Sequence, residues 1–111
     1  MGSIDVGRQL CVIGAAQHTV RDADAPEPLV SWAQRAREAA AVAGVESALP
    51  QIDSLQVVYC QSWPYDDPAG RLADALGAAP RHRLYSGIGG TTPQDLVNRT
   101  AAAMQRGEMD L

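Results

Sequence analysis

The residues best placed to do chemistry lie in residues 89–95, Gly-Gly-Thr-Thr-Pro-Gln-Asp, which should join a strand end to a helix start. Thr92 is a suitable N-cap, Pro93 suits the first helical position, and Asp95 lies three residues after the cap, where its carboxylate can reach back to the Thr92 amide. The glycines let the backbone approach a ligand or adopt positive φ, and free N–H groups at a helix start attract negative charge. The candidate substrate-binding residues are therefore Gly89, Gly90, Thr91 and Thr92.

A tight strand-to-helix turn with no ligand accounts for the same local sequence equally well, and both interpretations stay open. Two phosphate-binding motifs can be tested by spacing. A dinucleotide fingerprint needs glycines at its first, third and sixth positions, but counting from Gly87 places Thr92 sixth, and counting from Gly14 places Ala16 third. A P-loop fails as well, because no Gly-Lys pair follows these glycines.

The composition excludes several classes of function. The nine basic residues are all arginine, so the chain has no lysine to form a Schiff base or to hold a phosphate. A formal net charge of -4 argues against a broad nucleic-acid surface, which needs a basic face. The overall usage, 46% hydrophobic and 20% charged, is that of a globular chain with room for one small domain.

Few side chains remain as nucleophiles or ligands. Cys11 and Cys60 lie in apolar, strand-like runs and are expected to be small buried hydrophobes. His18 and His82 are expected to face solvent or to form local hydrogen bonds. The sequence therefore predicts no metal site and no cofactor.

The sequence shows neither a signal-peptide pattern nor a membrane-span pattern. Met1 to Arg8 lacks the basic segment followed by an apolar one that marks a signal peptide. No apolar stretch approaches the roughly 20 residues of a membrane span. We therefore expect a cytoplasmic protein that does not enter a membrane.

The elements that position the glycine-rich turn follow from periodicity and from helix start and stop signals. Strands and helices alternate with short connections, which predicts an α/β fold of mostly parallel βαβαβα layers with its binding site at the carboxyl ends of the strands. A loop rich in Asp, Ala and Pro (21–28) should follow the first strand. The expected elements are a buried strand at 10–16, a helix at 29–43, a strand at 52–60, a helix at 68–76 capped by Asp67, a strand at 83–85 and a helix at 93–106. Residues 108–111 are the approach to a fourth strand.

Several landmarks, taken in order, resemble the amino-terminal half of the thiolase superfamily. The closest likeness is to acetyl-CoA acetyltransferase-like members, whose strand-to-helix segment reads Ile-Gly-Gly-Asn-Thr-Pro-Gln or similar. The landmarks are Val-Ile-Gly-Ala-Ala-Gln at 12–17, the alanine-rich helix ending at Ala43-Gly44, Ile-Asp-Ser-Leu at 52–55, Asn98-Arg99, and Gly-Glu-Met-Asp-Leu at 107–111. The resemblance covers essentially the whole chain and implies one incomplete domain, residues 1–111, that stops at the fourth strand.

The resemblance also identifies the position of the family's nucleophile. In active thiolases a cysteine begins this helix and a glycine follows seventeen residues later; counting back from Gly107 reaches Gly90. A cysteine there would accept the acyl group from CoA, whereas glycine has no nucleophile. Thr91 and Thr92 have hydroxyls but no visible base to activate them.

The resemblance implies an acyltransferase of lipid metabolism that takes acyl-CoA as its substrate, with a homodimer as a candidate assembly and no nucleic-acid partner. Because Gly90 replaces the nucleophile, cysteine-dependent thiolysis is not expected from this segment. One alternative is a cysteine-independent aldolase that acts on CoA thioesters together with a partner protein. The other is a non-catalytic module, either one that binds CoA ligands or a truncated product.

Overall fold

The computed structural model describes residues 9–21 and 25–111. Two predictions concern residues outside this description: the absence of a signal peptide at 1–8, and positions 22–24 of the expected loop. Two parallel strands form a small sheet, with Ser54 opposite His82 and Val57 opposite Tyr85. The elements in order are α1 (Pro28–Ala43), the 3-10 helix η2 (Glu46–Gln51), β1 (Ser54–Val57), α2 (Pro68–Leu76), β2 (His82–Tyr85) and α3 (Thr92–Gln105).

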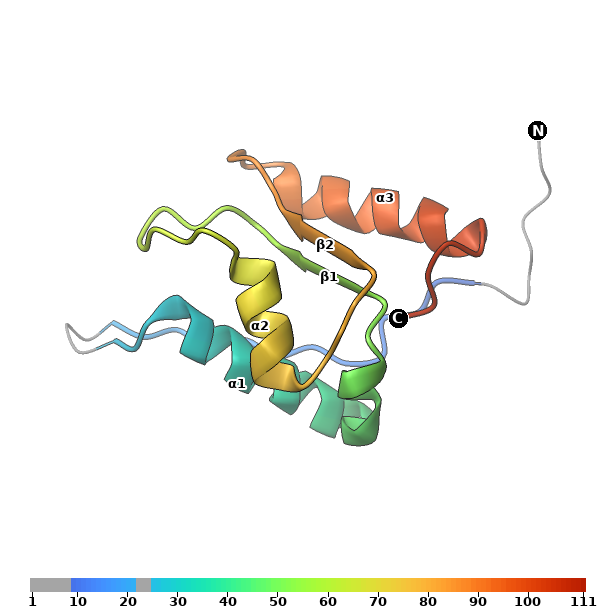
Figure 1. The fold of residues 1–111 in the computed structure, drawn as a ribbon, viewed down its shortest axis with the longest axis horizontal. Helices are drawn as coiled ribbons and strands as arrows, with labels where there is room; N and C mark the ends of the chain where they lie inside the picture. Colours follow the sequence, from blue (N-terminus) through green and yellow to red (C-terminus); the bar gives the residue numbers. More distant parts are fainter. Residues whose placement is uncertain (1–8, 22–24) are drawn as a thin grey trace.

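The sheet lies between two helical layers, with α1 and α2 on one side and α3 on the other (Figure 1). Alternation along β1 explains this arrangement, because neighbouring side chains of a strand point to opposite faces. Leu55 and Val57 are buried in the core with α1 and α2. Gln56 faces the other way, and its amide nitrogen donates to Thr100 of α3 at 2.8 Å. The predicted α/β class with parallel strands is confirmed.

Local sequence signals set both ends of α1 and α2. Pro28 and Pro68 stand in the first turns, where a missing N–H costs nothing. Gly44 and Gly77 end the helices at φ 71° and 70°, a left-handed conformation that glycine adopts without strain. The side chain of Asp67 accepts a hydrogen bond from the Gly70 amide at 3.1 Å and so caps α2 as predicted.

The core between α1, α2 and the sheet is built largely from small side chains. Alanine lets two helices approach one another closely, while leucine and valine supply most of the buried apolar area. Helix α2 contributes the most to this core and also contacts both strands. The buried core cluster consists of Ala33, Leu55, Val57, Ala69, Leu72, Ala73, Leu76 and Ala78.

The predicted first strand is wrong. Residues 10–16 form no strand, and no backbone hydrogen bond joins them to β1 or β2 within the described part of the chain. Val12 is 82% exposed and Ile13 55% exposed, so the run is not buried on both faces. It packs instead on α1, so tightly that a Cβ built on Gly14 would collide with the Ala39 carbonyl oxygen. An apolar run predicts burial, but a strand also requires a pairing partner, and this run has none in the sheet.

The end of the chain lies beside the start of β1. Residues 108–111 form no strand, but they do approach β1, because the Leu111 carbonyl accepts hydrogen bonds from the amides of Asp53 and Ser54 at 2.8 and 3.0 Å. The strand expected at 52–60 shortens to Ser54–Val57, the length over which β2 supplies a partner. Among the described helices, none has the length and apolar character needed to cross a membrane.

Candidate functional site

The glycine-rich turn lies where the sequence placed it, between the carboxyl end of β2 and the start of α3 (Figure 1). Gly89, Gly90 and Thr91 are exposed, and Thr92 is half-buried. The Thr92 amide donates to the Gly89 carbonyl at 3.2 Å, which closes a tight turn around the two residues between them. The structure thus brings the four predicted substrate-binding residues together at one exposed corner.

The predicted cap of α3 is wrong by one residue. Thr91 occupies the N-cap position, makes no side-chain capping bond, and leaves Thr92 as the first helical residue. The Asp95 amide donates to the Thr91 carbonyl at 3.0 Å, and the Thr91 hydroxyl lies 3.4 Å from the Asp95 carboxylate. The reason is the hydrogen bond from the Thr92 amide to the Gly89 carbonyl. It closes a turn that makes Thr92 the first helical residue, whereas a capping box at Thr92 requires the helix to begin one residue later.

The two glycines of the turn differ in the space around them. A Cβ built on Gly89 would lie 2.9 Å from the Thr92 hydroxyl oxygen, so a side chain there forces Thr92 to move. A Cβ built on Gly90 has no heavy atom within 4 Å. Neither glycine is among the positive-φ residues of the described chain, so the turn does not use the positive φ that glycine allows. The local backbone therefore does not require glycine at position 90.

The two histidines lie in different parts of the chain. His82 begins β2 and its Nδ1 lies 2.7 Å from the Ser54 hydroxyl, whereas Gly90 follows the other end of the same strand. His18 is exposed. The prediction of a solvent-facing or locally bonded histidine is confirmed for both residues. His82 therefore lies at the opposite end of β2 from Thr91.

The cysteine prediction is wrong for both residues. Cys11 is exposed because the run that contains it forms no strand. Cys60 is half-buried because β1 ends at Val57, so the thiol falls in the loop beyond the sheet. Its sulfur lies 3.4 Å from the Ser62 hydroxyl. No group of three or more potential metal ligands occurs among the described residues.

A second feature at the same end of the sheet was missed by sequence reasoning. A cavity of about 520 Å³ lies between the β1–α2 loop, the start of α2 and the last residue of β2. Three aromatic residues occur within positions 59–65, and this concentration of aromatic residues in a loop is the feature of the sequence that could have indicated a cavity here. The residues that line the cavity are Tyr59, Cys60, Trp63, Pro64, Tyr65, Asp66, Arg71 and Tyr85.

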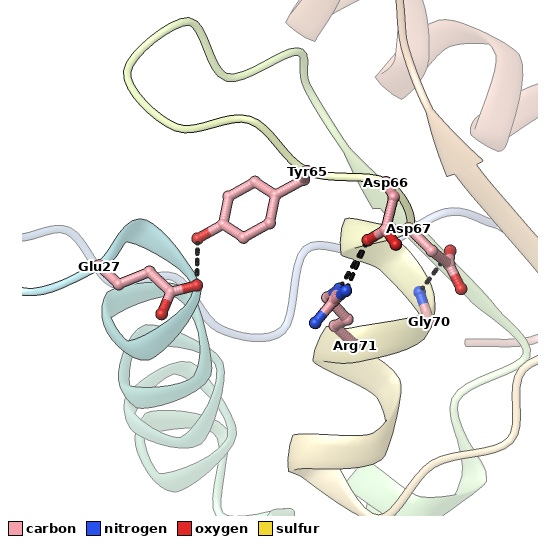
Figure 2. Close-up of polar contacts among 6 residues, drawn as sticks. All are labelled: Glu27, Tyr65, Asp66, Asp67, Gly70 and Arg71. Atoms are coloured by element: carbon pink, nitrogen blue, oxygen red, sulfur yellow. Dashed lines mark hydrogen bonds and ion pairs between the residues drawn. The ribbon is translucent and has the colours of Figure 1, made fainter.

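Polar contacts hold the loop beside this cavity (Figure 2). The Tyr65 hydroxyl donates to the Glu27 carboxylate at 3.0 Å and accepts from the Leu29 amide at 2.9 Å. Arg71 donates from Nε and Nη2 to the same oxygen of Asp66, at 2.9 and 2.6 Å. These contacts join the loop to the first turns of both α1 and α2.

The same contacts set the electrostatics of the loop. Partial burial, aided by the Glu27 carboxylate, raises the pKa of Tyr65 above its ordinary value. The hydrogen bonds from Arg71 lower the pKa of Asp66, and the carboxylate raises the pKa of the guanidinium in return. The pair is solvent-exposed and electrically neutral as a unit.

No family model and no curated protein sequence matches the chain. Among solved structures it is similar to a monomeric SCP2-thiolase-like protein type 1 from Mycobacterium smegmatis. The TM-score is 0.73 at 23% sequence identity, over 88% of this chain and 21% of that chain. The chain therefore spans about a fifth of that structure's length, and the likeness shows that it has a thiolase-like α/β fold.

Proposed function

We propose that this chain is part of a thiolase-fold protein that processes acyl-CoA thioesters, as the acetyl-CoA acetyltransferases do, but that supplies no cysteine nucleophile from α3. The thiolase-like fold supports the class, because the segments that resemble thiolases by sequence occur here in a chain with that fold. The observation that carries the proposal is the open space at Gly90, at the start of α3. That position admits a side chain, yet the sequence holds none.

Glycine at position 90 limits the kind of catalysis that the start of α3 can provide. A thiol at position 90 would stand at the N-terminus of a 14-residue helix, where the helix dipole favours the thiolate. Glycine removes that nucleophile and leaves the positive end of the helix exposed to a ligand. The role that remains is electrostatic stabilisation of a thioester or enolate oxygen, which needs positioned dipoles and no covalent intermediate.

Restoring the thiol tests the assignment. In Gly90→Cys, at the protein's natural length, we expect acetyl-CoA to acylate the new thiol, with the modified peptide identified by mass spectrometry. Gly87→Cys is the matched control, because a Cβ there also meets no atom within 4 Å while the residue lies outside the helix start. Cys11 and Cys60 report the background reactivity of thiols in the same molecule.

The outcomes separate cleanly. Acylation confined to Gly90→Cys supports the position as a degenerate nucleophile site. Equal acylation of Gly87→Cys, or none in either variant, contradicts it.

A second candidate function follows from the same missing thiol. Retro-aldol cleavage of a CoA thioester breaks a carbon–carbon bond through a stabilised enolate and needs no acyl-enzyme. We therefore propose an aldolase, acting with a partner protein, as the alternative. Cleavage of a β-hydroxyacyl-CoA by the unaltered protein, insensitive to thiol alkylation, supports the aldolase. If acetyl-CoA binds in calorimetry without either reaction, a non-catalytic module is favoured instead.

A further inference from the structure

The aromatic residues of this chain are gathered at one place. The sequence has two tryptophans, three tyrosines and no phenylalanine, and four of these five residues line the cavity of about 520 Å³ at the β1–α2 loop. The fifth, Trp32, packs against Tyr65 of the same cavity with ring centroids 5.4 Å apart. The four that line it are Tyr59, Trp63, Tyr65 and Tyr85. Trp32 and Tyr85 also pack against the buried core cluster, whereas Tyr59, Trp63 and Tyr65 do not belong to it.

Two of the rings are held in place by hydrogen bonds of their hydroxyl groups. The Tyr85 hydroxyl accepts a hydrogen bond from the Cys60 amide at 2.9 Å, which fixes the ring at the end of β2. Tyr65 is fixed by its bonds to Glu27 and to the Leu29 amide, as Figure 2 shows for Glu27. These anchored rings form a preorganised wall, so a ligand that meets them does not have to order them.

The other two rings offer exposed surface. Tyr59 stacks on Tyr85 with centroids 5.6 Å apart and an interplanar angle of 20°, yet it remains 46% exposed. Trp63 is 43% exposed and has no hydrogen-bond partner for its indole N–H within the described residues. Large exposed aromatic faces beside a cavity are typical of sites that stack on planar ligands.

One edge of the cavity is polar in a specific way. Asp66 and Arg71 both line the cavity and form an ion pair, so this edge presents carboxylate oxygen and guanidinium N–H side by side without net charge. Arg71 uses only Nε and Nη2 in this pair and keeps donors on its other nitrogen. A planar ring with a donor next to an acceptor on one edge complements that pair.

We propose that this cavity binds the purine base of a nucleoside or nucleotide, with the ring stacked on Tyr59 and Trp63 and its polar edge on Asp66 and Arg71. The position of the cavity supports this proposal. Ligands of open α/β sheets bind outside the carboxyl ends of the strands, and the cavity lies at the carboxyl ends of β1 and β2. The volume lies within the range of small-molecule pockets. The guanidinium is already neutralised and the chain carries a net charge of -4, so the base, and no polyanionic backbone, is what the site recognises. The proposal does not depend on the acyl-CoA function proposed above.

Adenosine is the probe, because it carries the base and lacks both phosphate and thioester. We expect saturable binding in an NMR titration, with shifts concentrated at residues 59–66, 71 and 85. Tyr59→Leu keeps an apolar side chain at this position but removes the exposed ring, and it should weaken adenosine binding about tenfold. Trp63→Leu should do the same, and it serves as the second variant if the first disturbs the fold. Val42→Ala, an exposed hydrophobic residue on α1, is the control and should leave binding unchanged.

The polar edge is tested separately. Asp66→Asn should weaken adenosine binding about threefold, and it should leave binding of naphthalene, which has no N–H to donate to the carboxylate, unchanged. Absence of saturable adenosine binding overturns the proposal, as does binding that neither Tyr59→Leu nor Trp63→Leu weakens. Much tighter, strongly salt-dependent binding of oligo(dA) assigns the surface to nucleic acid instead and also overturns it. Failure of acylation at position 90 bears on neither outcome, because adenosine carries no acyl group.

Discussion

The hydroxyl of Tyr65 donates a hydrogen bond to the carboxylate of Glu27 at 3.0 Å, although 38 positions of chain separate the two residues. The same oxygen accepts a hydrogen bond from the Leu29 amide, in the first turn of α1. Glu27, the N-cap residue, makes no side-chain capping bond of its own. A residue of the β1–α2 loop therefore satisfies one of the amides that a helix start leaves without a partner.

Removing this hydroxyl should destabilise the protein. In Tyr65→Phe the Leu29 amide and the Glu27 carboxylate lose their shared partner while the ring remains, so we expect a loss of about 1 kcal/mol in the free energy of unfolding. For a chain of this size that loss lowers the melting temperature by roughly 4–8 °C. Urea and thermal unfolding measure both quantities.

Tyr59→Phe is the matched control for that measurement. The Tyr59 hydroxyl has no hydrogen bond within the described residues, so its removal should change stability by less than about 0.5 kcal/mol. Similar losses in both variants would show that the hydroxyl of Tyr65 does not anchor α1.

The Tyr65 contact also predicts a pH dependence. Burial and the nearby Glu27 carboxylate raise the pKa of the phenol in the folded protein above its ordinary value of 10.0. A raised folded pKa gives stability that is present below the unfolded pKa and is lost as the pH rises through the folded pKa. The stability difference between the unaltered protein and Tyr65→Phe should therefore shrink above about pH 10. Unfolding curves from pH 8 to 11 test this, and a difference that stays constant across that range contradicts it.

The elements that sequence reasoning located correctly are those with signals inside a few residues. Helix α2 is an example, because Asp67, Pro68 and Gly77 specify its cap, first turn and end without reference to the rest of the fold. The alanine-rich face and Gly44 do the same for α1. The corner formed by Gly89, Gly90 and α3 followed from such local signals as well.

The features that sequence reasoning missed depend on partners far away in the chain. Residues 10–16 have the composition of a buried strand, but strand formation needs a backbone partner that composition does not reveal. Cys60 was placed inside a strand that ends at Val57, the last residue opposite β2. The aromatic cavity requires Tyr85 of β2 to meet the loop after β1, a contact that only the parallel register brings about.

The cap of α2 gives a third prediction. Asp67→Ala removes the carboxylate that accepts from the Gly70 amide, and we expect a loss of about 1 kcal/mol in the free energy of unfolding. Asp67→Asn should retain most of the stability, since asparagine caps helices well. Asp66→Ala, one residue earlier, removes only an exposed ion pair and should destabilise the protein clearly less than Asp67→Ala does. If the two alanine variants are equally destabilised, the Asp67 side chain is not the cap.

The packing of α2 against α1 and the sheet gives the last prediction. Ala73 is completely buried in the core cluster, so Ala73→Leu has no space for its added methylenes and should lower the free energy of unfolding by about 1–3 kcal/mol. Ala75 lies on the same helix with its side chain exposed, and Ala75→Leu should stay within about 0.5 kcal/mol of the unaltered protein. Helix propensity cancels between the two variants, because both exchange alanine for leucine in α2. A smaller loss of unfolding free energy in Ala73→Leu than in Ala75→Leu would contradict the packing described here, in which the Ala73 face of α2 lies against the core. Chemical denaturation of the two variants side by side measures the difference directly.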